Sequence, residues 1–135
     1  MTTTTTQKSA LETQEAGTHY KNLKVQPIEL AYYLGGTPAF CKLAKYISRD
    51  KDDKAEDLRK AYHCILLEEQ LSYYAKTNYK YVPWGKILYW VERFSDNLNI
   101  QQALKSLTEF DYEHALYWTE QEAADKGVDL NVQSK

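Results

Sequence analysis

The segment TPAFCKLAKYISRDKDDKAEDLRK, residues 37–60, decides how this chain folds. At about 100° per residue, its apolar and cationic side chains separate onto opposite faces of one short helix. The apolar face carries Phe40, Leu43, Ala44 and Ile47, and the opposite face carries Lys42, Lys45, Tyr46 and Arg49. The pattern predicts an amphipathic helix with one buried side and one basic side that can receive an anion.

Capping residues mark where this helix and the one before it begin and end. Pro27 suits the first position of a helix over PIELAYYL, because the donor that proline lacks would have no partner there. Gly35-Gly36 should end that helix, since glycine readily adopts the left-handed conformation of a C-terminal cap. Thr37 followed by Pro38 repeats the start signal, with threonine as the N-cap. We expect this second helix to reach about Arg49.

A third helix should start at Asp53, which forms an approximate capping box with Glu56. No proline or glycine interrupts the chain from there to about Tyr74, where we expect the helix to end. Its apolar stripe consists of Leu58, Ala61, Tyr62, Ile65 and Leu66. Residues 78–82 are polar and aromatic, which indicates a loop or a short extended piece.

The second half of the chain carries further start and stop signals. Pro83 should open a helix with a wide apolar face, and Asn99 is a plausible N-cap for the next one. Thr108 either lies inside that helix or caps a separate one that contains Phe110; the pattern leaves both versions open. Gly127 should close the last helix.

These elements predict an all-α fold, a compact bundle of about five or six helices. Residues 1–17 are rich in threonine and poor in large apolar groups, so we expect a disordered tail. Residues 18–127 should form a single helical domain, and residues 128–135 a frayed C-terminal tail.

Composition limits the classes of function. A formal net charge of −2 argues against a protein that coats nucleic acid, so nucleic acid is not the expected partner. Cys41 and Cys64 lack CxxC spacing, which gives no support for a disulfide scaffold or a structural zinc site and favours a reducing cytoplasm. No run of about 18 apolar residues occurs, so we expect no membrane span.

Several separated motifs occur in an order that resembles a phage-encoded family of small proteins, some of which are nucleoside monophosphate kinases without a P-loop. The matching motifs are His19-Tyr20, QPIE at 26–29, Phe40 with KYxxR at 45–49, and DLxKA at 57–61. The resemblance covers about residues 18–70. It implies a nucleotide-binding helical protein, often a homo-oligomer, in the cytoplasm of the host cell.

The resemblance also implies site residues. Lys45, Arg49 and Asp57 would be catalytic, and the ligand would be bound by His19, Tyr20, Lys42, Tyr46 and Lys60. Phosphoryl transfer usually needs a metal such as Mg²⁺, which Asp57 or Glu56 would anchor. The family commonly has a Gly-Asn pair where this chain has Cys41-Lys42. It also has a glycine-containing loop at the place of residues 50–54, which contain no glycine in this chain. Glycine lets a backbone approach phosphate closely, so this difference affects turnover more than binding.

Other interpretations stay open beside the kinase. The basic face of the second helix is about as well explained by solvated charges that interact with nearby carboxylates. The second half of the chain is rich in aromatic residues, which form part of the core, of an interface or of a nucleobase platform. These residues are Tyr79, Tyr81, Trp84, Tyr89 and Trp90. A viral counter-defence protein would use that half to block a host protein, or would sequester a nucleotide signal. Glu68, Glu69, Glu109 and Glu113 would serve a metal-dependent pyrophosphohydrolase, if they converge.

Overall fold

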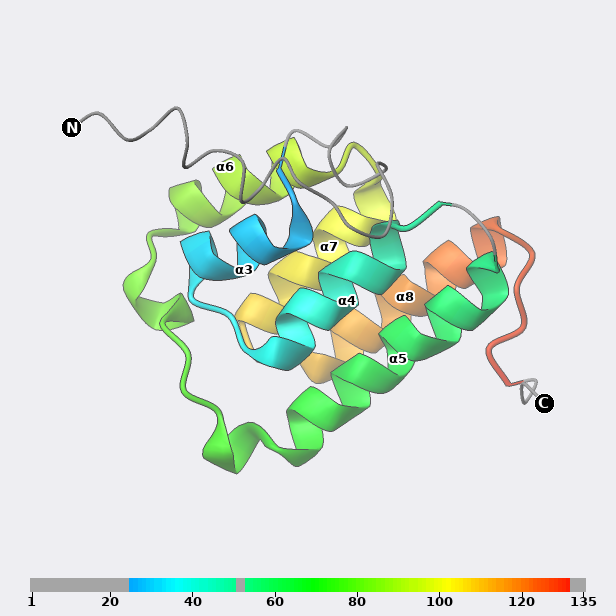
Figure 1. Ribbon diagram of the computed structural model, residues 1–135, viewed down its shortest axis with the longest axis horizontal. Helices are drawn as coiled ribbons and strands as arrows, with labels where there is room; N and C mark the ends of the chain where they lie inside the picture. Colours follow the sequence, from blue (N-terminus) through cyan, green and yellow to red (C-terminus); the bar gives the residue numbers. More distant parts are fainter. Residues whose placement is uncertain (1–24, 51–52, 132–135) are drawn as a thin grey trace, which may run out of the picture.

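The computed structural model describes residues 25–50 and 53–131, and these residues form six α-helices and no strand (Figure 1). The helices are α3 (Pro27–Leu34), α4 (Pro38–Ser48), α5 (Lys54–Gln70), α6 (Trp84–Phe94), α7 (Leu98–Thr108) and α8 (Tyr112–Asp125). Two short 3-10 turns, η1 (Ser72–Tyr74) and η2 (Tyr79–Tyr81), connect α5 to α6. The predicted all-α bundle is confirmed. His19, Tyr20 and the predicted tail lie outside the described residues.

The six helices form two layers of three. One layer holds α3, α4 and α5, in which α4 packs against both neighbours, and the other holds α6, α7 and α8. Across the layers, α3 contacts α6, α4 contacts α7 and α5 contacts α8 (Figure 1). Because α4 and α5 both belong to the first layer, one side of these helices faces α7 and α8, and no other described helix of the second layer packs on the opposite side.

Most predicted boundaries are confirmed, and the N-caps explain them. The Thr37 side chain accepts a hydrogen bond from the backbone N–H of Phe40, and Asp53 accepts one from Glu56. The assignment of Asn99 as an N-cap is wrong: Asn97 accepts from Ile100, so α7 begins at Leu98. Asparagine is a good cap at either position, and sequence spacing alone did not separate them.

Two other boundaries differ from expectation. Helix α5 ends at Gln70 rather than near Tyr74, and η1 follows it. The open alternative at Thr108 resolves into two helices, but the second is capped by Asp111 rather than by Thr108. Phe110 lies between them with a φ of 60°, a left-handed conformation that ends α7.

Gly35 fixes where the chain after η1 passes the end of α3 (Figure 1). It ends α3 with a φ of 69°, and its carbonyl accepts a hydrogen bond from the backbone N–H of Asn78 at 3.1 Å. A Cβ on this glycine would lie 2.6 Å from the Cβ of Asn78. A side chain here would therefore be strained in φ and would also collide with that segment.

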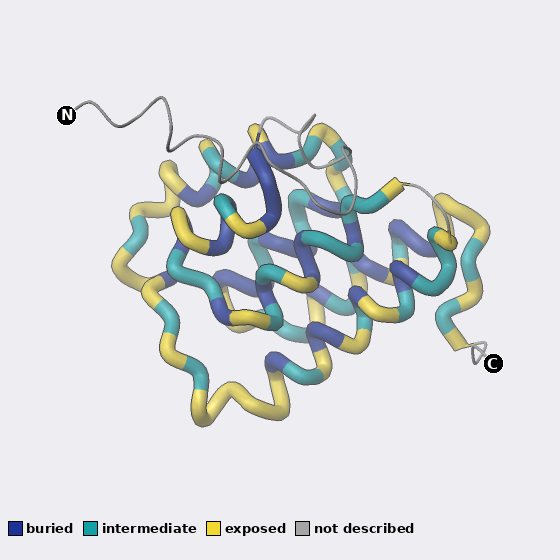
Figure 2. Tube along the Cα trace, viewed as in Figure 1, coloured by how far each residue is buried: buried dark blue, intermediate teal, exposed yellow. Residues whose placement is uncertain are grey.

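The core lies between the two layers, where buried residues alternate with exposed ones along each helix (Figure 2). All four apolar residues predicted for the buried face of α4 are fully buried. On α5 the prediction fails for Leu66, which is 41% exposed, while Glu68 is buried instead. Among the described residues, no helix is both long enough and apolar enough to cross a membrane.

Candidate functional site

Helices α4 and α5 line an open hollow of about 390 Å³. Helix α4 contributes Lys42 and Tyr46, one turn apart on its basic face. Helix α5 contributes Glu56, Arg59, Lys60, His63, Cys64 and Leu67. Three cationic side chains and one carboxylate therefore line the same hollow, which we call the basic cavity. Three predicted ligand-binding residues, Lys42, Tyr46 and Lys60, meet there.

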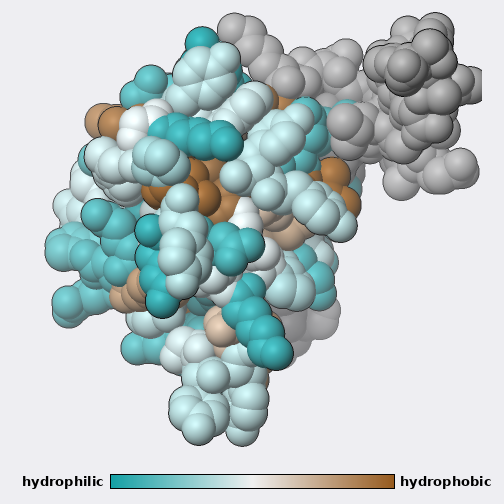
Figure 3. All heavy atoms as spheres, turned by 90° about the vertical axis from the view of Figure 1, so that its left-hand side faces the viewer, coloured by the Kyte–Doolittle hydropathy of each residue, from teal (hydrophilic) through white to brown (hydrophobic). Residues whose placement is uncertain are grey.

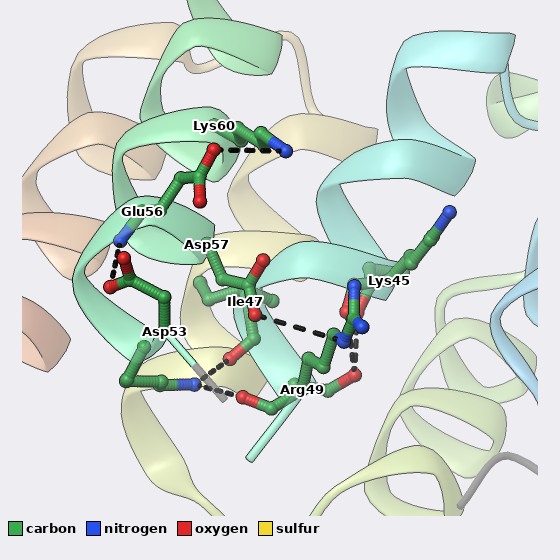
Figure 4. A network of polar contacts seen from close by, with 10 residues as sticks. Lys45, Ile47, Arg49, Asp53, Glu56, Asp57 and Lys60 are labelled. Carbon is green, nitrogen blue, oxygen red and sulfur yellow. Dashed lines mark hydrogen bonds and ion pairs between the residues drawn. The ribbon is translucent and has the colours of Figure 1, made fainter. Parts of the chain in front are cut away.

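Two ammonium groups lie close to the Tyr46 ring. The Nζ atoms of Lys45 and Lys60 each lie 5.3 Å from the centroid of this ring, one from α4 and one from α5. Lys60 extends from α5 toward α4, and its Nζ lies 3.4 Å from a carboxylate oxygen of Glu56 (Figure 4). Both partners are about half exposed, so this pair is weak and a bound phosphate can displace Glu56.

Arg49 and Asp57, two of the predicted catalytic residues, do not line the basic cavity. They form an ion pair beside it, with 3.8 Å between Arg49 Nε and Asp57 Oδ2 (Figure 4). Asp57 is only 5% exposed. Burial raises the pKa of its carboxyl, and Arg49 opposes part of that rise.

Lys54 binds the end of α4 beside this ion pair. Its Nζ donates to the backbone carbonyls of Ile47 and Arg49 at 3.0 and 2.6 Å. These carbonyls lie at the end of α4, where helical partners are missing. Arg49, Lys54 and Asp57 thus fasten the connection between α4 and α5, which holds the two walls of the basic cavity together.

Sequence analysis missed four lining residues, namely Arg59, His63, Cys64 and Leu67. For the last three a signal was present, because residues 60, 63, 64 and 67 share one face of a helix at i, i+3, i+4 and i+7. The Arg59 guanidinium donates to the backbone carbonyl of Asp129, which holds it at the edge of the cavity. Burial raises the pKa of Cys64, so its thiol stays protonated near neutral pH and is a poor nucleophile.

The carboxylates proposed for a pyrophosphohydrolase do not converge. Within residues 25–50 and 53–131, no three metal-ligating side chains come together. Glu68 is buried, whereas Glu69, Glu109 and Glu113 are exposed on three different parts of the chain. Among the described residues that line the basic cavity, Glu56 is the one carboxylate.

Glu68 belongs to a buried polar cluster at the start of α4. Its Oε1 accepts a hydrogen bond from the Thr37 hydroxyl at 2.5 Å, and the same hydroxyl accepts from the backbone N–H of Phe40. Glu68 Oε2 and the Tyr79 hydroxyl have no hydrogen-bond partner among the described residues. Burial raises the pKa of Glu68, and burial together with the Glu68 carboxylate raises the pKa of Tyr79.

Glu68 should make stability depend on pH. Its folded pKa lies above the ordinary value of 4.5, so its contribution is fully present below that pH and is lost as pH rises through the folded pKa. Glu68→Gln removes this charge, and we expect the variant to exceed the wild type in stability at pH 8, with the difference shrinking toward pH 4. Urea unfolding at several pH values measures this, with the exposed Glu69→Gln as control. Parallel pH profiles for wild type and Glu68→Gln would contradict the account.

Of the aromatic set predicted for the second half, only Tyr79 is buried in the core. Tyr81, Trp84 and Tyr89 are exposed, and Trp90 is half-buried with its ring 4.3 Å from that of Tyr33. On the face turned to the viewer in Figure 3, hydrophobic side chains gather in a central area surrounded by hydrophilic ones. His114 is exposed, and its Nδ1 lies 2.7 Å from a carboxylate oxygen of Asp111.

The fold and the site together define a class: a small two-layer helical protein with a basic cavity between two consecutive helices. No family model matches the chain, and no curated protein and no solved structure match it either. The resemblance to small phage kinases therefore stays a hypothesis.

Proposed function

We propose that this chain binds a nucleotide, and that Lys42 and Lys60 hold its phosphate groups in the basic cavity. One observation carries the proposal: the two lysines come from different helices and line the same hollow with Tyr46. On a merely solvated helix face the cations would point into open water, with no second helix opposite them. A cavity of about 390 Å³ also lies within the range of small-molecule sites.

The positions of the other charged residues favour binding over turnover. Arg49 and Asp57 would have to touch substrate in a kinase, yet they are paired beside the cavity, and Asp57 is buried. We assign them a positioning role, in which they hold α4 and α5 at the spacing that the ligand needs. Mg²⁺ would enter with the ligand's phosphates, with Glu56 as the carboxylate nearest to them. Relation to phage kinases and assembly into oligomers stay predictions.

A second candidate is a viral protein that sequesters a nucleotide signal, since it needs the same cavity and no catalytic residues. Exposed aromatic residues give it a surface for a host protein as well. Tyr73 and Tyr74 of η1 form an edge-to-face pair and are 90% and 74% exposed. Aromatic side chains are enriched at the centres of protein interfaces.

Calorimetric titration with nucleoside monophosphates, triphosphates and cyclic dinucleotides tests the proposal, with phosphoryl transfer assayed in parallel. We expect binding of at least one phosphorylated ligand, no binding of the matching nucleoside, and affinity that falls as salt rises. Turnover that disappears in Lys45→Ala would support a kinase, and tight binding without turnover would support sequestration. If none of these ligands binds, nucleotide binding is contradicted and a protein partner becomes the remaining hypothesis.

A further inference from the structure

A second cavity adjoins the basic cavity along the same pair of helices. It measures about 360 Å³ and lies between the start of α4 and the end of α5. Leu67 lines both cavities, so the two hollows meet at this side chain. Helix rise places Lys60 and Leu67 about 10 Å apart along α5, so a ligand of modest length spans both.

The two cavities differ in chemistry. Among the described residues, the first is lined by three cationic side chains, whereas the second has one, Lys76, and its walls include Ala39 of α4, Leu71 after α5 and the Tyr74 ring of η1. Tyr74 and Leu71 are exposed, which leaves apolar surface available to a ligand. We call this second hollow the apolar cavity. A molecule with an anionic end and a flat, weakly polar end matches the pair.

We infer that the base of the bound nucleotide lies in the apolar cavity while its phosphate lies between Lys42 and Lys60. The inference rests on the proposed function and adds the orientation of the ligand to it. A hydrocarbon tail would also fit apolar walls, but two features favour a base. The Tyr74 ring provides a surface for stacking. Glu68 forms part of the wall, and its buried Oε2 has no hydrogen-bond partner among the described residues, which favours a ligand end with an N–H donor over a hydrocarbon.

Three kinds of probe separate the contributions of the phosphate and of the base to binding: the deoxynucleoside monophosphates, ribose 5-phosphate and octyl phosphate. We expect the preferred nucleoside monophosphate to bind at least about tenfold more tightly than ribose 5-phosphate, which is the scale of one stacking contact. Octyl phosphate should bind less tightly than the preferred nucleoside monophosphate. If octyl phosphate binds as tightly as the nucleotide, the apolar cavity takes a hydrocarbon and the inference is wrong.

Variants that fill the apolar cavity test whether this cavity is the source of the tighter binding of the nucleotide than of ribose 5-phosphate. Ala39→Leu, on a half-exposed position of α4, should remove the advantage of the nucleotide and leave ribose 5-phosphate binding unchanged; Ala75→Leu, on the facing wall, should do the same. Ala124→Leu, on the exposed side of α8, is the matched control and should change neither. An advantage that survives both fillings would overturn the inference while leaving the proposed function standing. Failure of every phosphorylated probe to bind would overturn both.

Discussion

The double variant Lys42→Glu/Lys60→Glu should lose at least about 100-fold in affinity for a nucleoside monophosphate. A hydrogen bond to a charged group contributes about 1.5 to 3 kcal/mol, so the loss of two removes about 3 kcal/mol or more, and each tenfold change in affinity corresponds to about 1.4 kcal/mol. The new carboxylates add repulsion of the phosphate. Both lysines are exposed, so the fold should be retained, which circular dichroism checks.

The matched control is Lys80→Glu/Lys86→Glu. These lysines are exposed on η2 and α6, and neither lines the basic cavity. Both double variants change the net charge by the same amount, so long-range attraction of the ligand weakens equally in each. A control that loses as much affinity as Lys42→Glu/Lys60→Glu would show that overall charge, rather than this cavity, sets the binding.

Thr37→Val should destabilise the fold by about 2 to 4 kcal/mol. Two losses add up: the N-cap of α4, whose removal costs about 1 kcal/mol, and the hydrogen bond to buried Glu68, whose loss leaves an unsatisfied oxygen that costs about 1 to 3 kcal/mol. Valine has nearly the shape of threonine, so packing changes little. The free energy of unfolding in urea measures the effect.

Thr37→Ser is the control for that prediction, because serine keeps the hydroxyl and lacks only a methyl group. We expect it to stay within about 1 kcal/mol of the wild type. If Thr37→Ser is as unstable as Thr37→Val, the methyl group rather than the hydroxyl matters at this position. A Thr37→Val protein as stable as the wild type would show that Glu68 finds another partner or stays protonated at no cost.

The helices of the first layer were predictable because local signals agreed with one another. Pro27, Gly35, Thr37 and Asp53 each act on the backbone within a few residues, and the structure places each in its predicted role. At the end of α5, no glycine or proline marks the boundary. The helix stops at Gln70, although the sequence up to Tyr74 contains nothing that forbids a longer helix.

The basic cavity was only partly predictable. Periodicity placed Lys42 and Tyr46 on the open face of α4, but nothing in the spacing showed that α5 would lie opposite and bring Lys60 to the same ring. That proximity depends on how the two helices pack. The burial of Asp57, a predicted catalytic residue that does not line the basic cavity, also comes from packing. The burial of Glu68 was not predicted for the same reason, since an acidic residue beside Glu69 is typical of a solvated face.

The most direct test of the account is to map a bound nucleoside monophosphate by amide chemical shifts during a titration of the isotope-labelled protein. We expect the largest changes on α4 from Lys42 to Tyr46 and on α5 from Lys60 to Leu67, which form the walls of the basic cavity. Changes that concentrate on α6, α7 or α8 while α4 and α5 stay unaffected would contradict the proposal that this cavity holds the phosphate.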